Sequence, residues 1–236
     1  MLWGTGRNVP VAATIALDGP AGAGKTVVGI GVAREMGYLF LDTGAMYRAL
    51  TYLALQRNVA LTDQPALVEL AQQAAIDILP NGAADGRPYT VLAAGEDVTW
   101  HIRNLTVTES VSTLSSLPAV RHEMVQAQVR LAARGSCVLA GRDIGTVVLP
   151  QADLKIFLVA SLEERVRRRA EELRARGEEV DEAALRAAII ARDELDSRRE
   201  ASPLRPAEDA HMLDSTGMTV DQVVAMIVAL ARKGTD

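Results

Sequence analysis

The segment that most constrains the fold runs from Gly19 to Thr26. Its sequence, GPAGAGKT, matches the phosphate-binding pattern G-x-x-x-x-G-K-[ST] at every fixed position. Residues 11–17 before it are mostly apolar and favour a strand, and residues 26–36 after it carry apolar side chains at helical spacing. A strand, a glycine-rich turn and a helix predict a phosphate-binding loop (P-loop) and argue against a chance turn of small residues.

The residue types of this loop predict its chemistry. Its glycines let successive backbone N–H groups point inward at a phosphate, and the start of the helix adds partial positive charge. Lys25 is expected to reach the β- and γ-phosphates of a nucleotide, and the hydroxyl of Thr26 is expected to bind Mg2+. The predicted ATP-binding residues are Gly19, Pro20, Ala21, Gly22, Ala23, Gly24, Lys25 and Thr26.

Short apolar segments alternate with helical ones along most of the chain. Strands are predicted at 38–41, 138–140, 155–160 and 211–214, and helices at 45–56, 161–177, 181–199 and from Thr219 onward. Continuous apolar strands between helices predict an α/β fold with a parallel sheet covered on both faces. The length of 236 residues predicts a single domain over 1–236.

One region breaks this alternation. Residues 76–98 contain turn residues between short apolar runs, which predicts a small antiparallel insertion. The stretches before and after it, at 69–75 and 110–133, are predicted to be helical.

Composition narrows the possible partners. A net charge of -5 and few aromatic residues argue against a nucleic-acid surface. The sequence contains no run of about 18 apolar residues, so no membrane span is predicted. Residues 1–10 lack the apolar core of a signal peptide and are interpreted as an N-terminal extension. The single cysteine, Cys137, is expected to be a buried structural thiol. We therefore expect a cytoplasmic protein without nucleic-acid or membrane partners.

Two further segments follow predicted strands, at the sheet edge where open parallel sheets bind ligands. In residues 42–48, Arg48 lies one helical turn beyond Gly44 and is expected to face that edge. In residues 141–148, Arg142 can fork onto a phosphate and Asp143 can accept from a base amino group or a hydroxyl. An ordinary helix start and a tight turn with a local ion pair are the alternatives.

Two predicted helices carry charged residues along one face. Arg192, Asp196 and Arg199 share a face and suit a phosphate plus a ribose hydroxyl, or else form a solvated salt-bridge ladder. Arg165, Arg168 and Arg169 share a face of the preceding helix, which starts at a capping box. They predict a mobile cover that neutralises charge on a transferring phosphoryl group, or else simple i,i+4 pairs with glutamates.

Taken together, the chain resembles the bacterial cytidylate kinase family, a branch of the nucleoside monophosphate kinases. The resemblance covers all but about the first dozen residues, and the DTGAMYRA and GRDIGTVV strings are its most specific parts. The matching strings are GPAGAGKT at 19–26, LDTGAMYRA at 41–49, GEDVTWHIR at 95–103, VSTLSSLPAVR at 111–121, GRDIGTVVLPQADLKIFLVAS at 141–161, RDELDSRREASPL at 192–204 and DST at 214–216.

The resemblance implies a P-loop kinase with a central parallel sheet flanked by helices. It also implies a small β-containing acceptor-binding insert at about 62–118 and a helical lid at about 165–192. The implied reaction transfers the γ-phosphoryl group of ATP to CMP or dCMP with Mg2+, and a monomer is expected.

The same resemblance implies roles for individual residues. Lys25, Arg142, Arg165 and Arg169 are implied to be catalytic, Arg168 belongs to the lid, and Thr26 holds the metal. Within the acceptor site, Ser112, Arg121 and Asp143 are implied to contact the cytosine. The complete set of implied acceptor-binding residues is Thr43, Arg48, Ser112, Arg121, Arg142, Asp143, Arg192, Asp196 and Arg199.

Other functions are compatible with a P-loop. One alternative is a small-molecule kinase that acts on UMP, shikimate or a coenzyme precursor. Another is a nucleotide-dependent switch, against which the chain lacks an N-K-x-D base-reading string. A purely structural protein would leave the clustered motifs unexplained.

Overall fold

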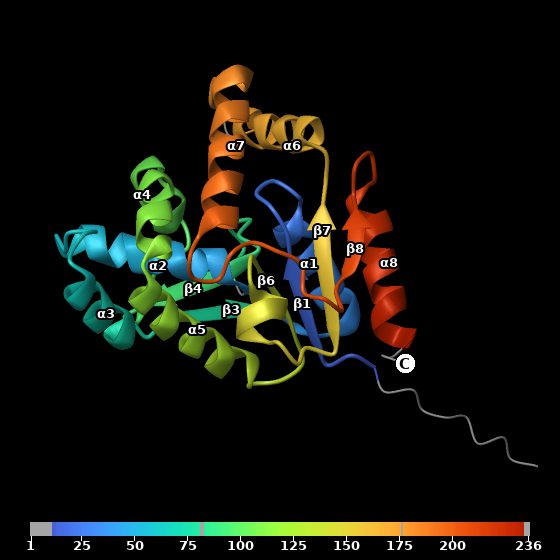
Figure 1. Ribbon diagram of the computed structural model, residues 1–236, viewed down its shortest axis with the longest axis horizontal. Helices are drawn as coiled ribbons and strands as arrows, with labels where there is room; N and C mark the ends of the chain where they lie inside the picture. The colour runs from blue at the N-terminus through green and yellow to red at the C-terminus, as the bar shows by residue number, and fades with distance from the viewer. Residues whose placement is uncertain (1–10, 81–82, 176, 234–236) are drawn as a thin grey trace, which may run out of the picture.

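The computed structural model describes residues 11–80, 83–175 and 177–233, and its centre is a five-stranded parallel sheet (Figure 1). The strand order is β2-β6-β1-β7-β8, so the strand that leads into the P-loop is the central one. This sheet confirms the predicted fold class. The strands are β1 (Thr14–Asp18), β2 (Leu39–Asp42), β6 (Cys137–Gly141), β7 (Leu154–Val159) and β8 (His211–Asp214).

Helices cover both faces of this sheet because its strands bury alternate side chains on opposite sides. In β1, Ile15 and Leu17 pack toward α1 and α8, whereas Ala16 packs toward α2. The two faces thus form two apolar cores separated by the sheet. The helices of these layers are α1 (Lys25–Met36), α2 (Thr43–Gln56), α3 (Gln64–Gln73), α4 (Leu105–Ser116), α5 (Pro118–Ala132) and α8 (Val220–Lys233).

Two further helices, α6 (Leu162–Ala175) and α7 (Glu182–Arg198), stand as a hairpin beyond the end of β7 (Figure 1). The strands of the sheet run toward this hairpin, so it faces their carboxyl ends. The N–H of Gly177, in the left-handed conformation at φ 78, donates to the carbonyl of Arg174, as expected of a helix-terminating glycine. The hairpin therefore overhangs the edge of the sheet where the P-loop lies.

The predicted antiparallel insertion is confirmed. The strands β3 (Asp77–Pro80), β4 (Tyr89–Ala93) and β5 (Glu96–Asp97) form a separate antiparallel sheet. Its inward-facing side chains, Tyr89 and Val91, join the core on the α2 side. A 3-10 turn (His101–Arg103) leads from this sheet into α4, whereas the predicted turn residues 81–82 lie outside the described residues.

Two predicted segments differ from the observed elements. The strand predicted to begin at Val11 begins at Thr14, and the helical stretch predicted over 110–133 consists of two helices, α4 and α5. Pro118 cannot donate a backbone hydrogen bond, and it forces the preceding Leu117 into an extended conformation. The predicted N-terminal extension, 1–10, lies outside the described residues, and the limits of the insert and lid stay predictions.

The last helix closes the core on one face of the sheet. Val223, Ile227 and Val228 on its inner face are buried, as the apolar stripe predicts. A Cβ placed on Gly31 of α1 would lie 2.6 Å from Val224, so glycine is what lets the two helices approach closely. Cys137 is buried as expected, and burial raises the pKa of its thiol to about 11. None of the described helices has the length and apolar character needed to cross a membrane.

Removing apolar volume from α8 should destabilise the fold. Ile227 is 1% exposed, so Ile227→Ala should lower the free energy of unfolding in urea by about 3 kcal/mol, within a range of about 2–5. The neighbouring Met226 is 46% exposed, so Met226→Ala should change it by about 0.5 kcal/mol or less. Equal losses in the two variants would contradict this docking face.

Candidate active site

The P-loop joins the carboxyl end of β1 to the first turn of α1. Gly19 and Gly24 have φ values of 148 and 93, which glycine adopts without steric cost. A Cβ on Gly19 would lie 2.0 Å from the carbonyl oxygen of Leu158, so the loop can pass this close to β7 only with glycine there. Glycine at these positions therefore meets a backbone requirement of the predicted phosphate cradle.

Lys25 is a buried cation at the base of this loop. Its Nζ donates to the carbonyl oxygens of Gly19 and Pro20 at 2.8 and 2.7 Å. Burial lowers the pKa of Lys25, and the guanidinium of Arg142 lowers it further. Such a cation is expected to favour an anionic ligand. The carboxylates that oppose the shift belong to Asp18, Asp42 and Asp196.

A carboxylate that we did not predict as a site residue lies beside Thr26. Asp42 ends β2, and its Oδ2 accepts hydrogen bonds from the Thr26 hydroxyl at 3.1 Å and the Tyr89 hydroxyl at 2.8 Å. Its Oδ1 caps α2 by accepting from the N–H of Ala45. An acidic residue at a strand's carboxyl end was the available signal, but sequence spacing does not reveal its approach to Thr26.

This pair of oxygen donors fits Mg2+. A hydroxyl and a carboxylate are hard ligands, and Mg2+ is commonly held by one or two carboxylates together with substrate phosphates and water. Within the described part of the chain, no group of three or more His, Cys, Asp or Glu residues is placed to hold a metal. Phosphates and water would therefore complete the coordination around Thr26 and Asp42.

Asp196 of α7 gathers three of the predicted acceptor-binding arginines. Its carboxylate pairs with Nε of Arg142 at 2.8 Å, Nε of Arg192 at 3.4 Å and Nη1 of Arg199 at 3.6 Å. Burial opposes ionisation of Asp196, but these guanidiniums hold its pKa below the usual range. Arg142 follows β6, so the cluster joins residues far apart in the chain. The solvated ladder that the spacing allowed is excluded, because Asp196 is buried.

The predicted cytosine-contacting residues lie next to this cluster. Arg121 and Asp143 form a 2.5 Å ion pair in which both side chains are buried. Arg121 also donates to the carbonyl of Ser115 at 3.1 Å and lies over the ring of Tyr47. Ser112 accepts a hydrogen bond from Arg192, which connects these residues to α7.

Arg48 brings a further positive charge to the same region. It donates to the hydroxyl of Thr108 at 2.8 Å. Burial lowers the pKa of Arg48, Asp42 opposes this, and Arg169 and Arg192 lower it further. Guanidiniums from α2, α6 and α7 are therefore close enough to repel one another, a situation that a bound anion would relieve.

Thr43 begins α2 below these arginines. Its side chain is buried, and its hydroxyl donates to the carbonyl of Ala140 at 2.9 Å. A hydroxyl has a single proton, so in this arrangement Thr43 bonds the end of β6 and does not donate to a phosphate.

The predicted lid arginines of α6 have separate positions. Arg165 donates to the P-loop carbonyl of Ala21 at 3.1 Å and pairs with Asp193 of α7 at 2.5 Å. Arg169 pairs with Glu172 and is the one near Arg48. Arg165 therefore contacts the P-loop, whereas Arg169 lies near Arg48, a predicted acceptor-binding residue.

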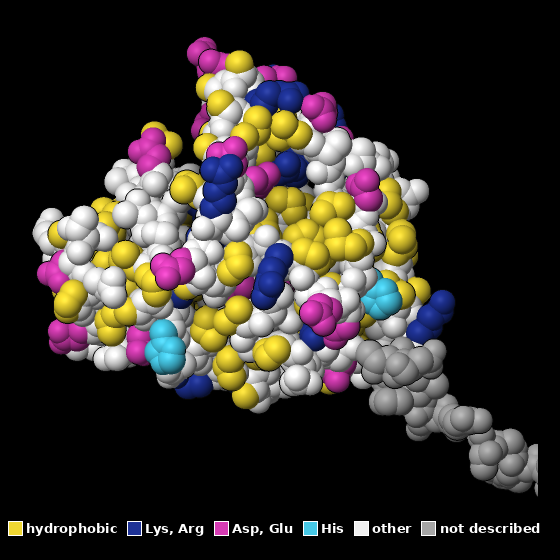
Figure 2. Space-filling model, viewed as in Figure 1, with side chains coloured by type: hydrophobic (Ala, Val, Ile, Leu, Met, Phe, Trp, Pro, Cys, Tyr) yellow, Lys and Arg dark blue, Asp and Glu magenta, His cyan; other side chains and the backbone are white. Residues whose placement is uncertain are grey.

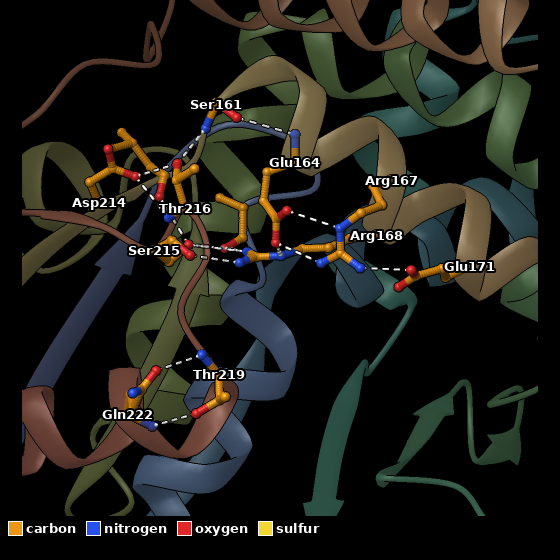
Figure 3. Close-up of polar contacts among 12 residues, drawn as sticks. Ser161, Glu164, Arg167, Arg168, Glu171, Asp214, Ser215, Thr216, Thr219 and Gln222 are labelled. Carbon is orange, nitrogen blue, oxygen red and sulfur yellow. Dashed lines mark hydrogen bonds and ion pairs between the residues drawn. The ribbon is translucent and has the colours of Figure 1, made fainter.

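Arg168 connects α6 to both the P-loop and β8 (Figure 3). It pairs with Glu164 at 2.7 Å and donates to the carbonyl oxygens of Ser215 at 2.7 Å and Ala23 at 3.3 Å. The i,i+4 glutamate pair expected from the sequence is thus present together with the loop contact. In the space-filling view, Lys and Arg side chains lie on and beneath α6 and α7, interspersed with Asp and Glu (Figure 2).

A double-mutant cycle can test the buried Arg121–Asp143 pair. Asp143→Ala leaves an uncompensated buried guanidinium, so it should lower the free energy of unfolding by about 3–5 kcal/mol, and Arg121→Ala should cost a similar amount. The double variant should lose clearly less than the sum, as measured by urea denaturation.

The exposed pair Arg134–Asp77 is the matched control for this cycle. The Arg134 side chain is 51% exposed, so Arg134→Ala should cost about 1 kcal/mol or less. Strict additivity at Arg121 and Asp143 would show that the two charges do not depend on each other.

Comparisons with known proteins identify the family of this chain. The family model described as cytidylate kinase matches residues 15–233. A cytidylate kinase from Pelotomaculum thermopropionicum is 48% identical over 220 residues, 93% of this chain and 96% of that protein. One from Desulforamulus reducens is 49% identical over 220 residues, 93% and 97% of the two chains.

A solved structure shares the fold. The crystal structure of an uncharacterized protein from Eubacterium ventriosum superposes with a TM-score of 0.52 at 12% identity, covering 93% of this chain and 98% of that one. At this identity the likeness concerns the fold alone.

Proposed function

The chain belongs to the cytidylate kinase family, and from this we propose that it transfers the γ-phosphoryl group of ATP to CMP or dCMP, giving ADP and CDP or dCDP. It is then an ATP-dependent nucleoside monophosphate kinase of pyrimidine nucleotide metabolism. The observation that carries the proposal is the convergence of Arg142, Arg192 and Arg199 on Asp196, close to Lys25. Two polyanions can meet only where their mutual repulsion is offset in this way.

The P-loop is the proposed donor site. Its backbone N–H groups and Lys25 would hold the phosphates of ATP, while Arg165 and Arg168 hold the loop from its carbonyl side. The loop is therefore braced on the side away from the nucleotide. A braced loop presents its N–H groups without further reorganisation, which favours transition-state stabilisation.

The acceptor would lie across from this loop, among α2, α4 and α7. Arg48, Arg142 and the α7 arginines are proposed to hold its phosphate. Asp143 can accept from the exocyclic amino group of cytosine, and Arg121 can donate to the acceptor atoms of the ring. The proposed sugar contacts are Arg192, Asp196 and Arg199. Since Arg121 and Asp143 are already paired, the base would meet a preformed polar edge.

Alignment and charge neutralisation account for the proposed mechanism. Phosphoryl transfer needs little covalent assistance from the protein, so no general base is assigned. Lys25, Arg142 and Arg169 would oppose charge on the transferring group, and Arg165 would keep the loop in place. Mg2+, held by Thr26 and Asp42, would supply further neutralisation of the phosphate charge when bound. A cytoplasmic monomer without nucleic-acid or membrane partners stays a prediction.

An acceptor panel with ATP and Mg2+ tests the function. The reaction is measured by coupled detection of ADP. Among CMP, dCMP, UMP, AMP, GMP and shikimate, CMP or dCMP should give the highest kcat/KM. Lys25→Met should lower kcat by about 100-fold or more, because it removes a cation from the transferring group. Lys233→Met, at an exposed position of α8, is the matched control.

Preference for another acceptor would reassign the substrate within the kinases. ATP hydrolysis at the same rate with and without every acceptor would instead favour a nucleotide-dependent switch.

The proposed metal role of Asp42 can be tested apart from turnover. Asp42→Asn keeps an oxygen that caps α2 but removes the negative charge beside Thr26. In a calorimetric titration, adding Mg2+ increases the affinity for ATP by a certain factor. This factor should be about tenfold smaller in the variant than in the wild type. ATP affinity without Mg2+ should not fall. An unchanged Mg2+ dependence would remove Asp42 from the metal site.

A further inference from the structure

Asp18 is a buried carboxylate that the proposed mechanism does not use. It is the last residue of β1, directly before the P-loop, and is 5% exposed. Its Oδ1 accepts from the N–H of Ile144 and its Oδ2 from the N–H of Gly145, each at 2.8 Å. We call this pair of bonds the Asp18 clasp. Each carboxylate oxygen thus has its own backbone donor.

The clasp joins the two substrate sides of the proposed site. Asp18 precedes the first glycine of the P-loop, whereas Ile144 directly follows Asp143. In the sheet, Asp18 lies opposite Gly141, so β6 ends beside it and the chain turns across the top of β1. The turn at Ile144–Val148 is further closed by hydrogen bonds from the N–H groups of Val147 and Val148 to the Asp143 carbonyl.

The turn also lies against the side chain of Lys155 at Gly145. A Cβ there would lie 3.2 Å from Cδ of Lys155 and 3.5 Å from Oδ2 of Asp18. Two successive N–H groups that point the same way form a concavity for an anion, and here the carboxylate of Asp18 is that anion. The clasp is therefore formed by two backbone donors of this turn.

On its other side, the same turn carries acceptor-site side chains. Arg142 pairs with Asp196 on α7, and Asp143 pairs with Arg121 on α5. The backbone of Arg142 and Asp143 must keep its position for these pairs to face a substrate. The clasp is a side-chain contact that joins this backbone to β1, the strand before the P-loop.

We propose that Asp18 is a positioning residue that fixes Arg142 and Asp143 relative to the P-loop, and so aligns the acceptor nucleotide with the phosphoryl donor. The proposal rests on the proposed function. Losing the clasp should impair acceptor binding and alignment far more than ATP binding, because the P-loop keeps its contacts with α6. Small misplacements of reacting groups cost large factors in rate.

The ionisation of Asp18 supplies a second readout. Burial raises its pKa to about 6, the two N–H bonds lower it, Asp143 raises it and Lys25 lowers it. The charged groups that face it are Lys25, Asp143 and Lys155, whose Nζ is bonded to Pro150 and Asp209. As the pH falls through about 6, the carboxyl gains a proton and loses part of its capacity to accept from two donors.

The same protonation should have the opposite effect on stability. The folded-state pKa of Asp18 lies above the usual value of an unfolded Asp, so the native chain binds more protons between about pH 4 and 6. Asp18 alone should therefore make the fold more stable as the pH falls through that window, while the clasp weakens. If Asp18 served only to stabilise the fold, stability and activity on the acceptor would change in the same direction as the pH falls.

Asp18→Asn is the test variant. Its amide oxygen can accept from one backbone N–H, but its own N–H2 would meet the other donor. At pH 7.5 the KM for CMP should rise about 10- to 100-fold, as expected on losing a charge-assisted hydrogen bond, and the KM for ATP should stay within about twofold. The ratio of wild-type to variant kcat/KM for CMP should fall toward one below pH 6. Ionisation of the substrates cancels in that ratio.

Asp153→Asn is the matched control. Asp153 accepts from the N–H groups of Ala13 and Thr14 at 3.0 and 2.8 Å, so it clasps the opposite end of the same strand, away from the site. Its KM values should stay within about twofold of the wild type, and its pH profile should follow the wild type. Equal effects of the two variants on CMP, or an equal rise of both KM values in Asp18→Asn, would overturn the proposal.

Hydrogen exchange separates this proposal from the proposed function. The Ile144 and Gly145 amides should exchange faster in Asp18→Asn, and this holds whichever acceptor the enzyme uses. Unchanged protection would overturn the clasp, whereas wild-type inactivity on CMP with faster exchange would overturn only the substrate assignment. If Asp18→Asn does not fold, Asp18→Glu, which keeps the charge but displaces it, should give the same KM split. An unaltered KM for CMP in that variant would overturn the proposal.

Discussion

The ion pairs around Asp196 are the interaction on which the rest of the site depends. Arg142, Arg192 and Arg199 converge on this carboxylate, and Arg142 also lies near the buried Lys25. Without a central anion, these cations would repel one another in a partly desolvated place, and burial raises the cost of that repulsion. Asp196 offsets part of this repulsion, and the remaining excess of positive charge suits the anionic substrates that we propose.

Helix α7 places this cluster next to the P-loop through two acidic residues that lie one turn apart. Asp193 accepts from the N–H of Ala21 and pairs with Arg165, so it contacts both the P-loop and α6. One turn later, Asp196 faces the acceptor arginines. A single helix therefore contributes to both halves of the proposed site. Movement of α7 would shift Asp193 and Asp196 together. The Asp18 clasp makes a second connection of this kind, at the level of the sheet.

Prediction from the sequence succeeded where local chemistry is distinctive and failed where the contact is long-range. The phosphate-loop pattern, the apolar strands and the turn-rich insertion each predicted the observed element, because each depends on neighbours in the chain. The break at Pro118 was missed, although a proline in a helical stretch is a local signal. Asp18 and Asp42 were not predicted as site residues. Asp18 meets the 144–145 turn, and Asp42 meets Thr26 and Tyr89, only when segments far apart in the chain assemble.

The order of residues was sufficient to establish the family, the α/β architecture and the identity of most charged groups at the candidate site. It left open whether the charges on α6 and α7 were solvated ladders or part of a shared site, because helical spacing is the same in both cases. Packing resolved this question for Asp196: the fold buries it among arginines from α7 and from the end of β6. The burial of a side chain and its contacts with residues on other strands depend on how several elements pack together. No local pattern of residues determines that packing.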